Sequence, residues 1–277
     1  MGQPIEIRDP ADPRLADFHD LTHADRRPDR PGGRGLVIAE GVPVVARLLA
    51  SAYRLRAVLG VASRIEALAA ELADVPAPVY TAAPEVMAQA VGFHLNRGVL
   101  ASADRPPTWS VEDLIGSARL IAVLEGVNDH ENLGSMFRNA AALGVDAVLL
   151  GPGCADPLYR RAVRVSMGHV LAVPFTELSA SPRFAAWPGA IKELQVSGFS
   201  VLAMTPAPGS VVLHELDPAR HLRRAVLVGA EGPGLSEEVL AVADLRVRIP
   251  MRAGVDSINV ATAAAIAFAH LSSGWSG

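Results

Sequence analysis

The chain is poor in several features whose absence limits what the protein can be. Among its 277 residues there is one cysteine, Cys154, which excludes an internal disulfide and fits a reducing compartment. Because Cys154 lies between Gly153 and Ala155 with no expected partner, we expect a structural loop residue rather than a nucleophile. Long apolar runs are also missing, since glycine, proline or a charge breaks each one well short of the roughly 18 to 20 residues that cross a bilayer.

The N-terminus shows no signal for export. Its first ten residues, MGQPIEIRDP, lack the apolar segment of a signal peptide. With no run long enough to span a membrane, we expect a cytoplasmic protein with no membrane partner. Metal binding is not expected either, because His19 and His23 have helical spacing but no third ligand follows them.

The formal net charge of -4 does not indicate nucleic-acid binding, so any RNA contact has to come from local positive charge. Lys192 is the only lysine, and the remaining cations are arginines, whose planar fork binds phosphate at two points. A polar segment between Leu21 and Gly35 is rich in arginine, although Asp25 and Asp29 halve its net charge and an ordinary solvated loop explains it equally well. The candidate phosphate contacts in this segment are Arg26, Arg27, Arg30 and Arg34.

Length and periodicity predict a two-domain α/β protein with a substantial core, since half of the residues are hydrophobic. Residues 1–104 have the pattern of a small α/β domain, and residues 105–118, with two adjacent prolines and no periodicity, are the expected linker. From 119 to 277 strands and helices alternate, which predicts a parallel sheet covered on both faces. The expected strands are 36–39, 55–61, 79–80, 120–124, 145–150, 170–174, 199–203, 225–229 and 245–249.

Two stretches carry polar residues in patterns typical of a binding site. In the helix expected at 132–143, apolar residues share one side, while Asn132, Ser135 and Asn139 form a polar stripe with Arg138 alongside. Asn128 or Asp129 is the expected cap. The second stretch, 227–271, contains a buried strand, a loop with Glu231 among glycines, a second strand, and a polar turn before an alanine-rich helix.

The glycines at 229, 232 and 234 predict a loop whose backbone approaches a ligand closely. Their order reverses the G-x-G-x-x-G dinucleotide fingerprint, which disfavours a nucleotide-dependent oxidoreductase. Some residues of this stretch have a structural explanation beside a binding role. Ile249 and Ile258 can be core residues at strand ends, and Ser257 and Asn259 can be helix caps.

These stretches resemble the three motifs of the SpoU (TrmH) family of RNA 2'-O-ribose methyltransferases, in the SPOUT superfamily. The segment 132–140 resembles the first motif, 229–235 with 249–251 the second, and 257–261 the third. The resemblance implies a C-terminal trefoil-knotted parallel-sheet SPOUT domain and a small N-terminal α/β domain similar to a ribosomal protein, which gathers RNA. It also implies S-adenosylmethionine as methyl donor, ribosomal or transfer RNA as substrate, and a homodimer.

The resemblance further assigns roles to residues. Arg138 would contact the target ribose and stabilise the developing alkoxide, a role for which His130 is a less favoured alternative as base. Asn132, Glu231 and Asn259 would complete the catalytic site. The residues implied in donor binding are Gly229, Ile249 and Ile258 through their backbone, with Thr205, Met251 and Ser257 nearby.

Outside these motifs, the arginine stripe at 160–164 is a second candidate RNA contact. In a dimer, Arg161 and Arg164 would hold RNA phosphate, with reach into the partner's active site. An RNA-binding or ribosome-assembly protein that keeps this fold without catalysis is the alternative function. The intact Asn132, Arg138, Glu231 and Asn259 disfavour it.

Overall fold

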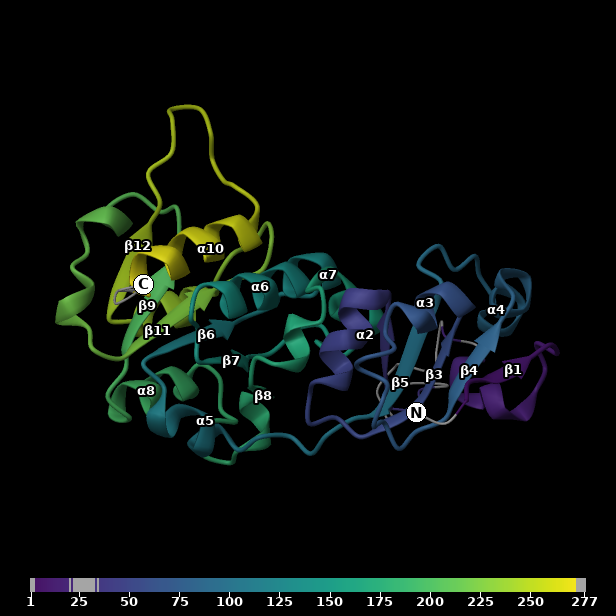
Figure 1. Cartoon of the computed structure of the whole chain (residues 1–277). Helices are drawn as coiled ribbons and strands as arrows, with labels where there is room; N and C mark the ends of the chain where they lie inside the picture. The colour runs from purple at the N-terminus through teal and green to yellow at the C-terminus, as the bar shows by residue number, and fades with distance from the viewer. Residues whose placement is uncertain (1–2, 20, 22–32, 34, 273–277) are drawn as a thin grey trace. The chain divides into compact units, whose positions relative to one another are not determined.

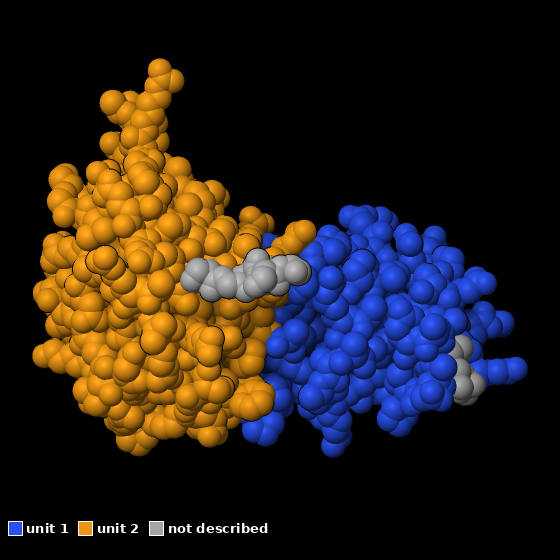
Figure 2. All heavy atoms as spheres, turned by 60° about the vertical axis from the view of Figure 1, so that its left-hand side comes forward, with its two compact units in different colours: residues 1–107, 156–172 blue, residues 108–155, 173–277 orange. Residues whose placement is uncertain are grey.

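The computed structural model describes residues 3–19, 21, 33 and 35–272 and is shown in Figure 1. The chain divides into two compact units, coloured separately in Figure 2. The first contains residues 1–107 and 156–172, and the second contains residues 108–155 and 173–277. The candidate phosphate contacts Arg26, Arg27, Arg30 and Arg34 lie outside the described residues.

The first unit is built on a five-stranded sheet with the order β1-β4-β3-β5-β2. Strands β1, β4 and β3 are parallel, and β5 runs antiparallel to β3 and β2. The strands are β1 (Ile5–Ile7), β2 (Leu36–Glu40), β3 (Leu55–Gly60), β4 (Val79–Ala82) and β5 (Val99–Asp104). The helices are η1 (Pro13–Phe18), α2 (Val42–Leu49), α3 (Ala62–Glu66), α4 (Pro84–Val91), α7 (Arg160–Val165) and η2 (His169–Leu171).

Strand β2 is buried along its whole length although it lies at the edge of its sheet. Helix α7 packs against it, which protects an edge that would otherwise offer free backbone groups. This helix comes from the segment 156–172, which the alternating pattern placed in the C-terminal domain and which the contacts group with the first unit.

The second unit contains a seven-stranded sheet in the order β10-β12-β9-β11-β6-β7-β8, and every pairing in it is parallel. The prediction of a parallel sheet is therefore confirmed. The strands are β6 (Leu120–Leu124), β7 (Ala147–Leu150), β8 (Phe175–Glu177), β9 (Ser200–Met204), β10 (Val211–Val212), β11 (Arg224–Val228) and β12 (Leu245–Arg248).

One strand prediction, at the junction between the two units, is wrong. The segment expected to be a strand at 170–174 is a turn of 3₁₀ helix followed by loop, and strand β8 begins only after Pro174. Proline has no backbone N-H to donate, so it serves here as an acceptor alone: the carbonyl of Pro174 accepts from Val148 N at 3.0 Å. The two-residue β10 was not expected, since so short a segment has no recognisable period.

Helices cover both faces of this sheet (Figure 1). Alternate strand residues, such as Ile121 and Val123 in β6, join one core with α5, α8 and α9. On the other face α6 and α10 pack against each other, α10 over β11 and α6 over β7. The helices are α5 (Val111–Ser117), α6 (His130–Ala142), α8 (Gly189–Val196), α9 (Glu237–Val242) and α10 (Val260–Leu271), with η3 (Leu178–Ala180), η4 (Leu213–Glu215) and η5 (Pro218–Arg220).

Helix α6 is fixed at its start and along its apolar side. Of the two expected caps, Asp129 is the one that acts: its carboxylate accepts from Glu131 N at 2.9 Å and from Asn132 N at 2.8 Å. Phe137 is fully buried and meets the ring of Phe175 edge to face, with centroids 5.4 Å apart. Within the described part of the chain, no helix is long and apolar enough to cross a membrane.

Replacement of Phe137 tests how far this packing stabilises the second unit. Phe137→Ala leaves a cavity under α6, and we expect the free energy of unfolding to fall by about 3–5 kcal/mol. The more conservative Phe137→Leu should cost less than about 1.5 kcal/mol. Urea denaturation followed by circular dichroism measures both, and equal stability of the two variants would contradict the packing described.

Cys154 provides a second test of burial in this unit. Its Sγ lies 3.3 Å from the carbonyl oxygen of Leu124, and burial raises the pKa of the thiol to about 11. Because only the thiolate reacts with alkylating agents, we expect iodoacetamide to modify the folded protein at pH 8 about a hundredfold more slowly than a free cysteine. The rate should increase with pH up to about 11. Modification of the folded protein at pH 8 as fast as that of the urea-unfolded chain would contradict the burial of the Cys154 thiol.

Candidate active site

The candidate site lies where three strands of the parallel sheet end. β9 is followed by Thr205, β11 by the glycine loop that begins at Gly229, and β12 by the loop from Ile249 to Asn259. This last loop is the yellow segment that extends from the sheet between β12 and α10 in Figure 1. Because the strands are parallel, their carboxyl ends meet at one edge, which is where open α/β sheets bind ligands.

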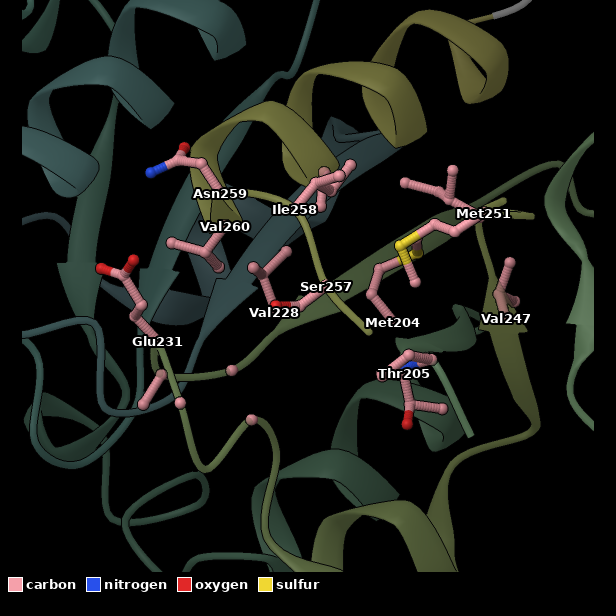
Figure 3. Close-up of a pocket in the computed structure, with 17 residues that line it drawn as sticks. Met204, Thr205, Val228, Glu231, Val247, Met251, Ser257, Ile258, Asn259 and Val260 are labelled. Carbon is pink, nitrogen blue, oxygen red and sulfur yellow. The ribbon is translucent and has the colours of Figure 1, made fainter. Parts of the chain in front are cut away.

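A pocket of about 350 Å3 opens at this edge, a volume within the range of small-molecule sites (Figure 3). Among the described residues that line it, Glu231 is the only one with a charged side chain. Figure 3 shows Glu231 and Asn259 together at one end, with Val247 and Met251 at the other. The lining residues are Met204, Thr205, Pro206, Val228, Gly229, Ala230, Glu231, Gly232, Gly234, Val247, Ile249, Met251, Ser257, Ile258, Asn259, Val260 and Ala263.

The glycine loop is a tight turn closed on itself. Ala230 N donates to Gly234 O at 3.1 Å, and Gly234 N donates to Ala230 O at 3.0 Å. Gly232 and Gly234 have φ of 90° and 73°, which side chains disfavour, and a Cβ at either would meet open space. The positive φ, rather than crowding, therefore favours glycine at these two positions.

Gly229 is present for a different reason than the one expected. A Cβ on this residue would lie 2.2 Å from both the carbonyl carbon of Gly234 and the nitrogen of Leu235. The protein's own backbone, not a ligand, therefore requires glycine here. Its backbone still lines the pocket, so the residue both closes the turn and faces the cavity.

A chain of side-chain hydrogen bonds joins the three motif segments. Asn132 Nδ2 donates to Glu231 Oε2 at 2.8 Å, and Asn259 Nδ2 donates to Asn132 Oδ1 at 2.8 Å. Asn132 is only 9% exposed, so both ends of its amide need protein partners. The structure thus brings together residues that are far apart in sequence.

Asn259 caps α10, as helix capping predicted, and it also bonds to Asn132. Its Oδ1 caps α10 by accepting from Ala261 N at 3.0 Å and Thr262 N at 3.1 Å, while its Nδ2 holds Asn132. A second bond ties the same two helices, from Asn139 Nδ2 to the carbonyl oxygen of Ala261 at 3.0 Å. The start of α10 is therefore held against α6 at two points.

The residues expected to bind the donor lie together. Thr205, Gly229, Ile249, Met251, Ser257 and Ile258 all line the pocket. Sequence reasoning missed Val228 and Met204, which face the pocket as ordinary strand-end apolar residues. These two carried no signal beyond hydrophobicity.

Arg138 is placed differently from the other predicted catalytic residues. It is exposed on α6 and does not line the pocket, and none of the described residues pairs with it. His130, the first residue of α6, does not line the pocket either. Arg161 and Arg164 lie on α7 in the first unit.

Glu125 is a supporting residue that sequence reasoning missed. Its carboxylate accepts from Ser236 N at 2.9 Å, Ser236 Oγ at 2.7 Å and Trp187 Nε1 at 2.6 Å. Ser236 lies just after the glycine loop, at the N-cap position of α9 but without a side-chain capping bond, so Glu125 holds the end of that loop. The available signal was a carboxylate placed immediately after the buried strand β6.

No candidate metal centre accompanies this pocket. Among residues 3–19, 21, 33 and 35–272, no group of three or more His, Cys, Asp or Glu side chains could hold a metal ion.

Comparison with known proteins shows which proteins share this chain's sequence and fold. Residues 119–269 match the model of the SpoU rRNA Methylase family. The chain is 58% identical over 264 residues to an uncharacterized tRNA/rRNA methyltransferase of Mycobacterium tuberculosis, covering 95% of this chain and 90% of that protein. It is 32% identical over 160 residues to the 23S rRNA (guanosine(2553)-2'-O)-methyltransferase RlmP of Bacillus subtilis, covering 58% of this chain and 60% of that protein.

Solved structures share the fold over nearly the whole chain. An AdoMet-bound rRNA methyltransferase from Sinorhizobium meliloti superposes with a TM-score of 0.77 at 24% identity, covering 98% of each chain. A putative RNA methyltransferase of the TrmH family from Porphyromonas gingivalis gives a TM-score of 0.67 at 26% identity, covering 86% of this chain and 90% of that one. The family model spans the parallel-sheet unit with its pocket and all three motif segments. The chain therefore belongs to the SpoU rRNA methylase family.

Proposed function

We propose that this protein transfers a methyl group from S-adenosylmethionine to a ribose 2'-OH of ribosomal or transfer RNA. The observation that carries the proposal is the hydrogen-bonded chain from Glu231 through Asn132 to Asn259 at one end of the pocket. Its three members come from the three motif segments, and the relatives include a 23S rRNA 2'-O-methyltransferase.

The pocket fits the proposed donor in size and chemistry. Its volume of about 350 Å3 suits a ligand of nucleoside size, and its walls are largely apolar side chains and exposed backbone. When bound, S-adenosylmethionine supplies a methyl group on a positively charged sulfur. The backbone at Gly229, Ile249 and Ile258 would hold the donor, with Thr205, Met251 and Ser257 beside it.

We assign Arg138 to the acceptor rather than the donor. An in-line displacement needs the ribose hydroxyl held at near-contact distance and the growing negative charge on its oxygen stabilised. A guanidinium provides both by binding the ribose and its adjacent phosphate, and it does so without giving up a proton. The exposure of Arg138 supports this assignment, because an RNA strand must reach it from solvent.

The proposal includes a homodimer and a trefoil-knotted path in the second unit. In the proposed dimer a second copy would cover Ile266, which is 40% exposed on α10. In such a dimer, Arg161 and Arg164 would reach the active site of the partner chain and contact the phosphate of the RNA bound there. Arg26, Arg27, Arg30 and Arg34 and the small first unit as a whole would gather the RNA substrate.

Replacement of Arg138 separates donor binding from methyl transfer. We expect Arg138→Ala to leave the Kd for S-adenosylmethionine within about twofold and to lower kcat/KM on bulk ribosomal RNA at least about a hundredfold, because the alkoxide loses its stabilising cation. Calorimetry and tritiated-methyl incorporation measure the two quantities. Arg220→Ala is the matched control, since Arg220 is 83% exposed and, among the described residues, pairs only with the nearby Asp217. Retained activity in Arg138→Ala would remove this residue from the mechanism.

Replacement of Asn132 tests whether the hydrogen-bonded chain shapes the pocket. Asn132→Ala removes two hydrogen bonds, one to Glu231 and one to Asn259, and we expect about 1–3 kcal/mol of lost stability and about tenfold weaker donor binding. Asn132→Asp should be worse, because it sets a second carboxylate against Glu231. Ser135→Ala, on the same helix, is the control. Donor affinity unchanged in both Asn132 variants would show that the chain is only structural.

A further inference from the structure

Glu125, the residue directly after strand β6, uses both oxygens of its carboxylate within the protein. Oε1 accepts from Ser236 Oγ at 2.7 Å and from Trp187 Nε1 at 2.6 Å, and Oε2 accepts from Ser236 N at 2.9 Å. Glu125 is not among the described residues that line the donor pocket. It therefore acts on the site through the groups that it binds, rather than by touching a ligand.

The backbone after β6 also lies against the glycine loop. Glu125 N donates to Val228 O at 3.0 Å, just before the loop begins. Gly126 approaches the loop so closely that a Cβ on it would lie 3.1 Å from the Cβ of Ala230. These two residues thus contact the start of the glycine loop through their backbone, and its end at Ser236 through the Glu125 carboxylate.

Helix α6, which follows the same segment, holds the middle of the loop. Asn132 Nδ2 donates to Glu231 Oε2 at 2.8 Å. The stretch from Glu125 to Asn132 therefore bonds to the loop at Glu231 and at Ser236, on either side of the turn at 232–234. A loop held on both sides has fewer conformations, so the backbone that it presents to the pocket is already ordered.

Trp187 fixes the direction in which the Glu125 carboxylate points. Its indole is half-buried and packs so closely on Gly151 that a Cβ there would lie 3.2 Å from two carbons of the ring. An indole has a single N-H donor, and packing leaves this ring little freedom, so the bond to Oε1 has a defined direction. Trp187 thus orients Glu125, and Glu125 in turn orients Ser236.

We propose that Glu125, oriented by Trp187, is a positioning residue for the methyl donor. It binds Ser236 while Asn132 binds Glu231, and the glycine loop is held in its binding conformation before the donor arrives. A preformed loop spares the donor the entropy of ordering it, so the effect falls on donor affinity rather than on the chemical step. This inference rests on the proposed function, since it takes S-adenosylmethionine as the ligand of the pocket.

The test compares donor binding and turnover of the full chain in variants of this contact. Glu125→Gln keeps one acceptor oxygen and sets an NH2 group against the N-H donors of Ser236 or Trp187. We expect the Kd and KM for S-adenosylmethionine to rise about tenfold, with kcat at saturating donor within about threefold of the wild type. Calorimetry and tritiated-methyl incorporation into bulk ribosomal RNA measure these quantities.

Three further variants calibrate this result. Ser236→Ala and Trp187→Phe each remove one of the bonds, and each should raise the donor Kd about threefold. Glu112→Gln is the matched control, because Glu112 also accepts from a serine hydroxyl, that of Ser181 at 2.7 Å, but does not contact the glycine loop or line the pocket. Its donor Kd should equal that of the wild type.

A double variant distinguishes positioning from a simple effect of charge. If Glu125 acts through Ser236, Glu125→Gln combined with Ser236→Ala should bind the donor no more weakly than Glu125→Gln alone. Losses that multiply would overturn the proposal, because they would show that Glu125 affects the donor by another route. Should Glu125→Gln fail to fold, unchanged donor affinity in both Ser236→Ala and Trp187→Phe would overturn it equally.

The same measurements distinguish failure of this inference from failure of the proposed function. Normal donor affinity in Glu125→Gln, with only a lowered unfolding temperature, would leave Glu125 a structural residue while the wild type still methylates RNA. A wild type that takes up no S-adenosylmethionine in calorimetry would overturn the proposed function, and with it the donor as the ligand that Glu125 helps to position.

Discussion

The amide of Asn132 is the constraint on which the site depends. A buried primary amide has to place its donor and its acceptor, and here each is used once, toward Glu231 and toward Asn259. Asn259 also caps α10, so the residue that bonds to Asn132 is the one at which the final helix begins. One polar side chain on α6 therefore determines how the glycine loop and the last helix meet, and with them the shape of one end of the pocket.

The parallel sheet provides the frame within which this amide can act. Strands β9, β11 and β12 end at one edge of the sheet, so the sheet itself brings together the loops that follow them. Glu125 and the closed turn from Ala230 to Gly234 then hold the glycine loop from behind. Strand packing sets where the loops begin, and a few hydrogen-bonded polar groups set the conformation of the glycine loop.

Much of this arrangement was predictable from the sequence, for identifiable reasons. Buried strands such as 120–124 are continuous apolar runs, and α6 has both a capping aspartate and a clear apolar side. The six predicted donor-binding residues line one pocket because strand ends and loop starts carry most of its wall. The hydrogen bonds between Asn132, Glu231 and Asn259 follow no sequence pattern, since they depend on long-range geometry.

Other features could not be predicted because they depend on contacts between distant segments. Gly229 was interpreted as making room for a ligand, whereas the backbone of Gly234 and Leu235 occupies that space. The ion pairs around Glu40 join residues from three separate segments. The sequence predicted that Arg138 lies on a helix, but it did not show that this residue is outside the pocket lining.

The segment 156–172 has a consequence for how this protein could have been assembled. The polypeptide passes from one unit to the other after residue 107, again after 155, and once more after 172. A cut at the first junction alone would leave α7 on one piece and the strand β2 that it shelters on the other. Exchange of the small unit between relatives would therefore require matched joints at all three crossings.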